Sequence, residues 1–146
     1  MWKRVIFFCI ALALMISGSS AEQVPSEASG SPQGNYVLVY YFHGDFRCVS
    51  CHRIETYTRE AVDEYFGKEM NSGKLVFKTV NVDRRENQHF IKDYQLYTKS
   101  VVVSLVKDGK EAKYENLQAV WNYLRDKQSF FIYIKDEVGK YLEELG

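Results

Sequence analysis

The chain has 146 residues, of which 46% are hydrophobic and 15% aromatic, and it carries 19 basic and 19 acidic side chains. That length predicts one domain of ordinary size, whose core needs neither a metal nor a disulfide scaffold. The balanced charge excludes the basic excess that is typical of nucleic-acid-binding proteins. We therefore expect no nucleic-acid partner.

Residues 1–21 have the pattern of a secretory signal peptide. A short basic region, residues 2–4, precedes an apolar stretch, residues 5–16, which is too short for a comfortable membrane span. Small residues at 19–21 then offer a cleavage site. The pattern predicts an extracytoplasmic protein, periplasmic or secreted. A membrane attachment is expected only if the segment stays uncleaved and acts as an anchor.

Residues 22–35 predict a flexible linker. This segment is rich in Ser, Gly, Gln and Glu, holds both prolines of the chain and lacks aromatic residues. It therefore has too little apolar surface to order itself. The folded domain is expected over residues 36–146, where Cys48 and Cys51 are the only cysteines, because Cys9 belongs to the signal segment. One cysteine pair in an exported domain indicates redox chemistry or cofactor attachment.

The first half of this domain alternates between strand and helix patterns. The nearly continuous apolar run at residues 36–42 predicts a central strand that is buried on both faces. Helical periodicity starts near residue 52 and ends at residues 71–73. A second strand is expected over residues 75–82, followed by a short helix over residues 87–94.

The second half begins with a β-branched strand, residues 101–106. Asp108-Gly109 predicts a tight hairpin into a short strand, residues 111–114. Two helices follow, over residues 117–124 and 129–145. The order β-α-β-α-β-β-α predicts parallel crossovers and then an antiparallel edge. We therefore expect an α/β fold of three layers, α/β/α, with a mixed sheet of about four strands and an extra C-terminal helix.

The most informative motif is Cys48-Val49-Ser50-Cys51, which stands between the first strand and the first helix. Two cysteines at this spacing can close a small disulfide and reopen it. The start of a helix carries partial positive charge and unpaired N–H groups, which favour a thiolate over a thiol. The motif thus predicts a redox-active disulfide, with Cys48 as the exposed nucleophile and Cys51 as the resolving thiol.

Nearby polar residues are candidates for a supporting role. Arg47, His52 and Arg53 add positive charge beside the cysteines, which favours the thiolate further. His43, in the loop before the motif, is a candidate proton acceptor or hydrogen-bond partner. Glu55, one helical turn after the motif, is a candidate buried acid or a solvated helix charge.

Two cofactor hypotheses compete with the redox interpretation. Cys48 to His52 reads CxxCH, the attachment pattern of c-type haem, with His52 as the axial ligand and Met70 as the only methionine after the signal segment. A zinc site would combine both cysteines and His52 with either His43 or His89. No glycine-rich phosphate loop follows a predicted strand, so neither a flavin nor a nicotinamide site is indicated. We expect no metal and no cofactor.

The element order, with strand, CxxC and helix at its head, resembles the thioredoxin-like superfamily over about residues 36–124. Residues 81–83 resemble the turn after the second thioredoxin strand, and residues 106–110 its closing hairpin. A narrower resemblance is to the family named nitrophenyl compound nitroreductase subunit. It rests on Val-Tyr-Tyr-Phe-His-Gly before the motif, on Asn-Val-Asp with the following Glu86-Asn87, and on residues 93–101.

The resemblance implies thiol–disulfide exchange with a redox partner protein or a protein disulfide substrate. For the narrower family it implies a flavoprotein reductase partner, and the competing class is a non-catalytic thioredoxin-fold subunit. Thioredoxins place a cis-proline where this chain has Lys99-Ser100-Val101, so Ser100 and Val101 are expected to face the disulfide. They also bury an aspartate beneath the second cysteine, and alignment places Tyr40 there.

Overall fold

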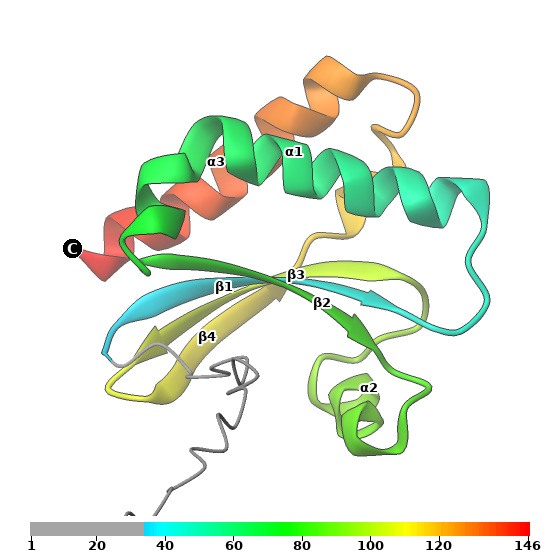
Figure 1. Ribbon diagram of the computed structural model, residues 1–146, viewed down its shortest axis with the longest axis horizontal. Coiled ribbons are helices and arrows are strands. Elements are labelled where there is room, and N and C mark those ends of the chain that lie inside the picture. The colour runs from blue at the N-terminus through cyan, green and yellow to red at the C-terminus, as the bar shows by residue number, and fades with distance from the viewer. Residues whose placement is uncertain (1–33) are drawn as a thin grey trace, which may run out of the picture.

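The computed structural model describes residues 34–146. The predicted signal segment and almost all of the predicted linker lie outside the described residues, so both stay predictions. In the part that is described, a mixed four-stranded sheet has helices on both faces (Figure 1). None of the helices within residues 34–146 combines the length and the apolar character that crossing a bilayer requires.

The sheet has the strand order β2-β1-β3-β4. The first strand, β1 (Tyr36–His43), pairs in parallel with β2 (Leu75–Asn81) and antiparallel with β3 (Ser100–Lys107). The last strand, β4 (Lys110–Asn116), forms the antiparallel edge beside β3. The two strands with nearly continuous apolar sequence are therefore the two central ones, because only they are covered on both faces.

The predicted three-layer arrangement is confirmed. Helices α1 (Val49–Asn71) and α3 (Lys127–Leu145) cover one face of the sheet, and the short helix α2 (His89–Asp93) lies on the other (Figure 1). A 3₁₀ turn, Arg85–Asn87, leads into α2. The loop from β1 to α1 emerges at the same end of the sheet as α2.

The helix predicted over residues 117–124 is wrong. That segment holds only a 3₁₀ turn, Gln118–Trp121, before α3 begins. The reason is that Glu115 and Asn116, the two residues directly before this segment, pair with β3 as part of β4. The strand ladder satisfies their backbone groups, and the residues left before the Asp126 cap of α3 form only a single turn.

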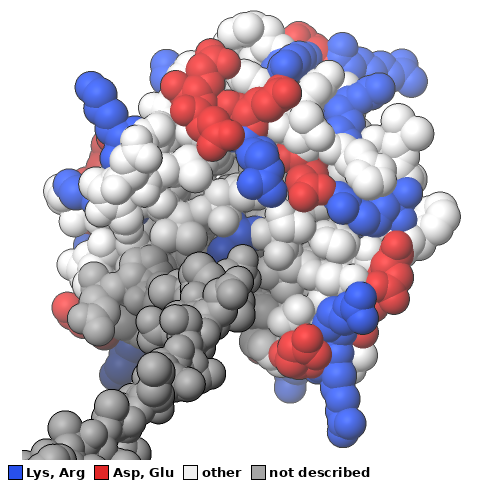
Figure 2. Space-filling model, viewed as in Figure 1, with Lys and Arg blue, Asp and Glu red and all other residues white. Residues whose placement is uncertain are grey.

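The hairpin between β3 and β4 turns at Asp108 and Gly109, as predicted. Both residues have positive φ angles, 51° and 73°, which a two-residue turn that matches the strand twist requires. Charged side chains of both signs are interspersed over the face seen in Figure 2. On that face, basic and acidic side chains are therefore mixed, and neither sign of charge forms a separate patch.

Side chains of β1 alternate between two separate cores. Val37, Val39 and Tyr41 join the core beneath α1 and α3, whereas Leu38 and Tyr40 join the core beneath α2. Successive residues of a strand point to opposite faces, so one position along β1 decides which core a side chain enters. This alternation places the residues around the cysteine pair.

Candidate active site

Cys48 and Cys51 form a disulfide at the start of α1, with their Cα atoms 5.0 Å apart. The helix begins at Val49, earlier than residue 52, and Cys48 is its N-cap, with extended backbone angles of −86° and 169°. The Cys51 amide donates a hydrogen bond to the Cys48 sulfur over 3.2 Å. Since the first turn of α1 also lacks an acidic residue, the helix terminus offers this sulfur a donor and a partial positive charge.

The two cysteines differ in exposure. Cys48 is partly exposed, whereas only 1% of Cys51 is accessible. Phe46 and Val49, on either side of Cys48, are each 77% exposed. A partner molecule can therefore approach Cys48 across an apolar surface, while Cys51 is reached only through its neighbour. This geometry agrees with the roles of nucleophile and resolving thiol that the motif predicts.

The residue beneath Cys51 is Tyr41 and not Tyr40. The Tyr41 hydroxyl donates to the Cys51 carbonyl over 2.7 Å, and its side chain is fully buried. Tyr40, which the resemblance placed at this position, points to the opposite face of the sheet and packs beneath α2. The prediction is corrected by one residue, because a shift of one position along a strand moves a side chain to the other face.

Arg47, which directly precedes Cys48, forms an ion pair with Glu55, which lies four residues after Cys51. The guanidinium of Arg47 lies over the Tyr41 ring, 5.8 Å from its centroid. Burial raises the pKa of Glu55, but Arg47 together with Thr79 and Arg59 outweighs it, and the net pKa lies below the usual value. Glu55 is therefore a bound carboxylate, neither the free buried acid nor the solvated helix charge that the sequence suggested.

The loop that carries the cysteines is tied to the end of β2. The Asp45 amide donates to the Asp83 carboxylate over 2.7 Å, and the Asn81 side chain donates to the Asp45 carboxylate over 2.7 Å. A Cβ at Gly44 would lie 2.6 Å from the same Asp83 carboxylate, so a larger residue here would displace the Asp83 side chain that binds the Asp45 amide. These contacts hold the loop close to β2 before it reaches Cys48.

The remaining predicted residues lie at the same end of the sheet. His43 is half-buried, with its Nδ1 2.8 Å from the Gly44 carbonyl oxygen. Ser100 pairs with Phe42 across the β1–β3 ladder, and Val101 pairs with Tyr41. Both Ser100 and Val101 are buried beside the strand that leads to the cysteines. His52 is exposed on α1, and its amide donates to the Cys48 carbonyl.

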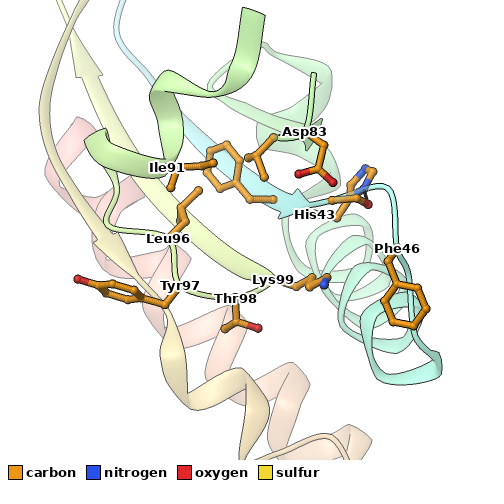
Figure 3. Close-up of a pocket in the computed structure, with 11 residues that line it drawn as sticks. His43, Phe46, Asp83, Ile91, Leu96, Tyr97, Thr98 and Lys99 are labelled. Atoms are coloured by element: carbon orange, nitrogen blue, oxygen red, sulfur yellow. Dashed lines mark hydrogen bonds between the residues drawn. The ribbon is translucent and has the colours of Figure 1, made fainter. Parts of the chain in front are cut away.

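A cavity of about 190 Å³ opens beside this loop (Figure 3). His43 and Asp83 lie next to each other at one side, and the side chain of Lys99 extends across toward Phe46. The Lys99 ammonium lies 5.8 Å from the centroid of the Phe46 ring. The lining is completed by Phe42, Gly44, Val82, Ile91, Leu96, Tyr97 and Thr98. Tyr97, which is 89% exposed, and Phe46 were missed by the sequence reasoning. The only sequence feature that could have indicated them is an aromatic residue in a predicted loop.

Comparison with known proteins bears on the fold alone. No protein-family model and no curated protein matches the chain. Similar solved structures include a reduced thioredoxin preprotein of Schistosoma mansoni, with a TM-score of 0.45 and 16% identity, covering 74% of this chain and 81% of that one. The thioredoxin of Fasciola hepatica has a TM-score of 0.40 and 20% identity, covering 69% and 83%. A cysteine-to-serine mutant of the Entamoeba histolytica thioredoxin has a TM-score of 0.39 and 24% identity, covering 68% and 83%.

The fold is thioredoxin-like. This conclusion rests on the strand order and pairing and on the position of the cysteine pair between β1 and α1, because the scores above are too low to carry it. The narrower resemblance to the nitroreductase subunit family finds no support among these similar proteins.

The two cofactor hypotheses gain nothing from the geometry. Within residues 34–146, no group of three or more His, Cys, Asp or Glu side chains is placed to hold a metal ion. His89, one of the candidate zinc ligands, pairs with Asp93 on α2. Met70, the candidate second ligand of a haem, lies near the far end of α1, about 28 Å along the helix axis from Cys51.

Proposed function

We propose that this protein is a thiol–disulfide oxidoreductase that uses Cys48 as the nucleophile and Cys51 as the resolving thiol. The observation that carries the proposal is the placement of Cys48. It is the N-cap of a long helix, its sulfur accepts the Cys51 amide, and it is partly exposed while Cys51 is buried. Helix termini of this kind stabilise the thiolate, which is the reactive form of cysteine.

The exchange proceeds in two steps. The Cys48 thiolate attacks one sulfur of a substrate disulfide, which forms a mixed disulfide and expels the other substrate sulfur as a thiolate. Cys51 then loses its proton, and its sulfur attacks the Cys48 sulfur and expels the second substrate sulfur as a thiolate. The two substrate thiolates take up that proton and one from solvent. The products are the Cys48–Cys51 disulfide and a substrate dithiol, so two electrons pass to the substrate. A redox partner protein must return them for a second turnover.

A protein disulfide is the substrate class that fits this surface. Phe46 and Val49, within two residues of the reactive sulfur, are large, apolar and exposed, and Tyr97 is exposed at the neighbouring cavity. The cavity between His43 and Lys99 adds room for a side chain next to it. An extended polypeptide covers such a surface better than a small thiol does, because apolar contact area drives association.

The proposal includes export of the protein, for which the predicted signal peptide at residues 1–21 is the support. It also includes a dedicated electron donor, for which a flavoprotein reductase is a candidate, as the resemblance to the nitroreductase subunit family implied. N-terminal sequencing of the protein purified from its own cells tests export. A mature N-terminus near residue 22 is expected, and an intact residue 1 would contradict cleavage.

The central experiment measures alkylation of the reduced protein with iodoacetamide at about pH 6, with the modified residue identified by mass spectrometry. Cys48 is expected to react about tenfold faster than a cysteine of the unfolded chain, because more of it is thiolate. Cys51→Ser is then expected to accumulate a mixed disulfide with a reducible protein substrate, and Cys48→Ser is the matched control that does not.

Three results would contradict this function. Slow alkylation of both cysteines, together with no mixed disulfide in Cys51→Ser, would favour a non-catalytic subunit that uses the same fold for binding. A Soret absorption band in the purified protein would favour c-type haem attachment through the CxxCH motif. Stoichiometric zinc in the purified protein would favour a metal site.

A further inference from the structure

We propose that Arg47 supplies the positive charge that sets the reactivity of the cysteine pair, and that Glu55 is the positioning residue that holds its guanidinium in place. This inference deepens the proposed thiol–disulfide exchange and rests on it. Arg47 and Glu55 set the electrostatic environment of a site in which the strand beneath the cysteines offers a tyrosine and no acid.

Arg47 is turned inward toward the base of the site. It directly precedes Cys48, and only 24% of its side chain is exposed. Its guanidinium covers the Tyr41 ring, 5.8 Å from the centroid, and the hydroxyl of that tyrosine donates to the Cys51 carbonyl. The cation thus lies on the side chain that supports the second cysteine, in a partly desolvated place where a charge acts over a longer range than it does in water.

Glu55 holds this cation from the helix side. It lies four residues after Cys51, one turn along α1 on the same face. Its carboxylate contacts the Arg47 guanidinium and accepts a hydrogen bond from the Thr79 hydroxyl over 3.2 Å. The Arg59 guanidinium lies 3.7 Å away, and the Glu55 side chain is 19% exposed. These three donors hold the Glu55 carboxylate in one position. The carboxylate in turn holds the Arg47 guanidinium in place.

One donor of Arg47 is left without a partner. Within residues 34–146, its Nε is the single buried side-chain nitrogen or oxygen with no hydrogen bond. A buried N–H without an acceptor is unfavourable, and it favours any state that brings a negative charge close to it. Reduction of the disulfide converts two neutral sulfurs into a thiol and a thiolate, and so creates a negative charge at Cys48, the residue directly after Arg47.

Other charged groups around the cysteines are more exposed or differently engaged. His52 and Arg53 are exposed on α1, and the Arg53 guanidinium lies 3.4 Å from the Leu124 carbonyl. His43 faces the loop carbonyl of Gly44. Solvent screens an exposed charge strongly, so Arg53 is a natural control for Arg47. Both arginines lie within two residues of a cysteine, yet only Arg47 is partly buried, over the ring of the tyrosine that bonds to Cys51.

The first experiment compares Arg47→Gln with Arg53→Gln, each reduced, by measuring the rate of Cys48 alkylation from pH 4 to 9. Loss of a nearby positive charge disfavours the thiolate. Arg47→Gln is therefore expected to raise the pH at which the alkylation rate is half its maximum, the midpoint, and to slow alkylation at about pH 6 by about tenfold. Arg53→Gln is expected to change that rate by less than about twofold. Equal effects of the two substitutions would overturn the inference.

The second experiment separates positioning from plain charge by using Glu55→Ala. Removing a negative charge alone favours the thiolate and lowers the midpoint. Releasing Arg47 has the opposite sign, and we expect it to dominate, so that Glu55→Ala raises the midpoint. Glu55→Gln keeps an acceptor for Arg47 and is expected to leave the midpoint at or below that of the unmodified protein. In the Arg47→Gln background there is no guanidinium to release, so adding Glu55→Ala is expected to lower the midpoint below that of Arg47→Gln alone. A lower midpoint in Glu55→Ala would overturn the role of Glu55.

Failure of this inference is distinct from failure of the proposed function. If the unmodified protein shows no fast alkylation and Cys51→Ser traps no mixed disulfide, the function itself is wrong. If both are observed and the Arg47→Gln midpoint is unchanged, only the inference is wrong. Circular dichroism checks that each variant is folded. Arg47→Lys keeps the positive charge without the planar guanidinium. Its alkylation midpoint is expected to lie between those of Arg47→Gln and the unmodified protein.

Discussion

Tyr40 and Tyr41 are neighbours on β1, yet they belong to two different chemical environments. Tyr41 lies beneath α1, donates to the Cys51 carbonyl and is covered by the Arg47 guanidinium. Tyr40 lies on the opposite face of the sheet, beneath α2. There it packs against other aromatic rings at centroid distances of 5.0 to 5.9 Å, those of Phe42, Phe90 and Tyr94. The same residue type therefore serves the site on one face and the packing on the other.

The charged groups that act on the buried tyrosines differ between the two faces. On the α2 face the Glu111 carboxylate accepts hydrogen bonds from the Tyr94 and Ser104 hydroxyls, each over 2.5 Å. Burial, and then the negative charge of Glu111, raise the pKa of Tyr40 to about 12 and that of Tyr94 further. Burial raises the pKa of Tyr41 as well, but Arg47 opposes it. A cation stabilises an anion placed near it, and the cysteine pair lies on the face where Arg47 provides that cation.

The largest expected difference concerns the two hydrophobic cores. Ile134 is fully buried between α3 and the sheet, whereas Leu96 is 9% exposed in the core beneath the short helix α2. Ile134→Ala is expected to cost about 3–4 kcal/mol of unfolding free energy and Leu96→Ala about 2 kcal/mol, since the thinner layer can relax into the gap. Urea unfolding measures both. Equal costs would show that the two faces are equally rigid.

The second prediction is that Tyr40 and Glu55, one from each face, affect stability at opposite ends of the pH scale. The folded state keeps the Tyr40 proton up to a pKa of about 12, whereas the unfolded chain releases it near 10. Stability is therefore complete below pH 10 and falls above it, by at most about 1.4 kcal/mol per pH unit for each such tyrosine. Tyr40→Phe is expected to flatten this alkaline decline in unfolding free energy measured by urea titration.

For Glu55, on the site face, the pH dependence of stability has the opposite sign. The pKa of Glu55 is lowered in the folded state, so its contribution is present above the ordinary value of 4.5 and is lost as the pH falls through the folded value. Glu55→Gln is expected to flatten the acid decline and to leave the alkaline one unchanged. If Glu55→Gln altered the alkaline limb instead, the assignment of the two faces would be wrong.

The smallest expected effect compares two hydroxyl deletions at neutral pH. Tyr41→Phe removes the donor to the buried Cys51 carbonyl and is expected to cost about 1–2 kcal/mol. Tyr40→Phe keeps the ring in the aromatic cluster and is expected to cost less than about 0.5 kcal/mol. Urea unfolding at pH 7 gives both numbers, and a Tyr40→Phe cost as large as that of Tyr41→Phe would contradict the comparison.

Much of the fold was predictable because its signals are local. The apolar run of β1 identified a central strand, the β-branched run identified β3, and Asp108-Gly109 identified the hairpin, since each pattern reflects the geometry of a few adjacent residues. The CxxC between a strand and a helix placed the cysteine pair for the same reason. Local sequence also predicted a helix over residues 117–124, and there the pairing of Glu115 and Asn116 with β3 prevailed.

By itself, the amino-acid sequence determined the order of the elements, the position of the disulfide and the apolar faces, because these depend on near neighbours along the chain. Tertiary structure alone decided that Tyr41 supports Cys51, that Glu55 holds Arg47, and that the Asp83 carboxylate lies against Gly44. Each of these contacts depends on strand register and on which face a side chain enters. One residue of register reverses the face, and no local pattern records it.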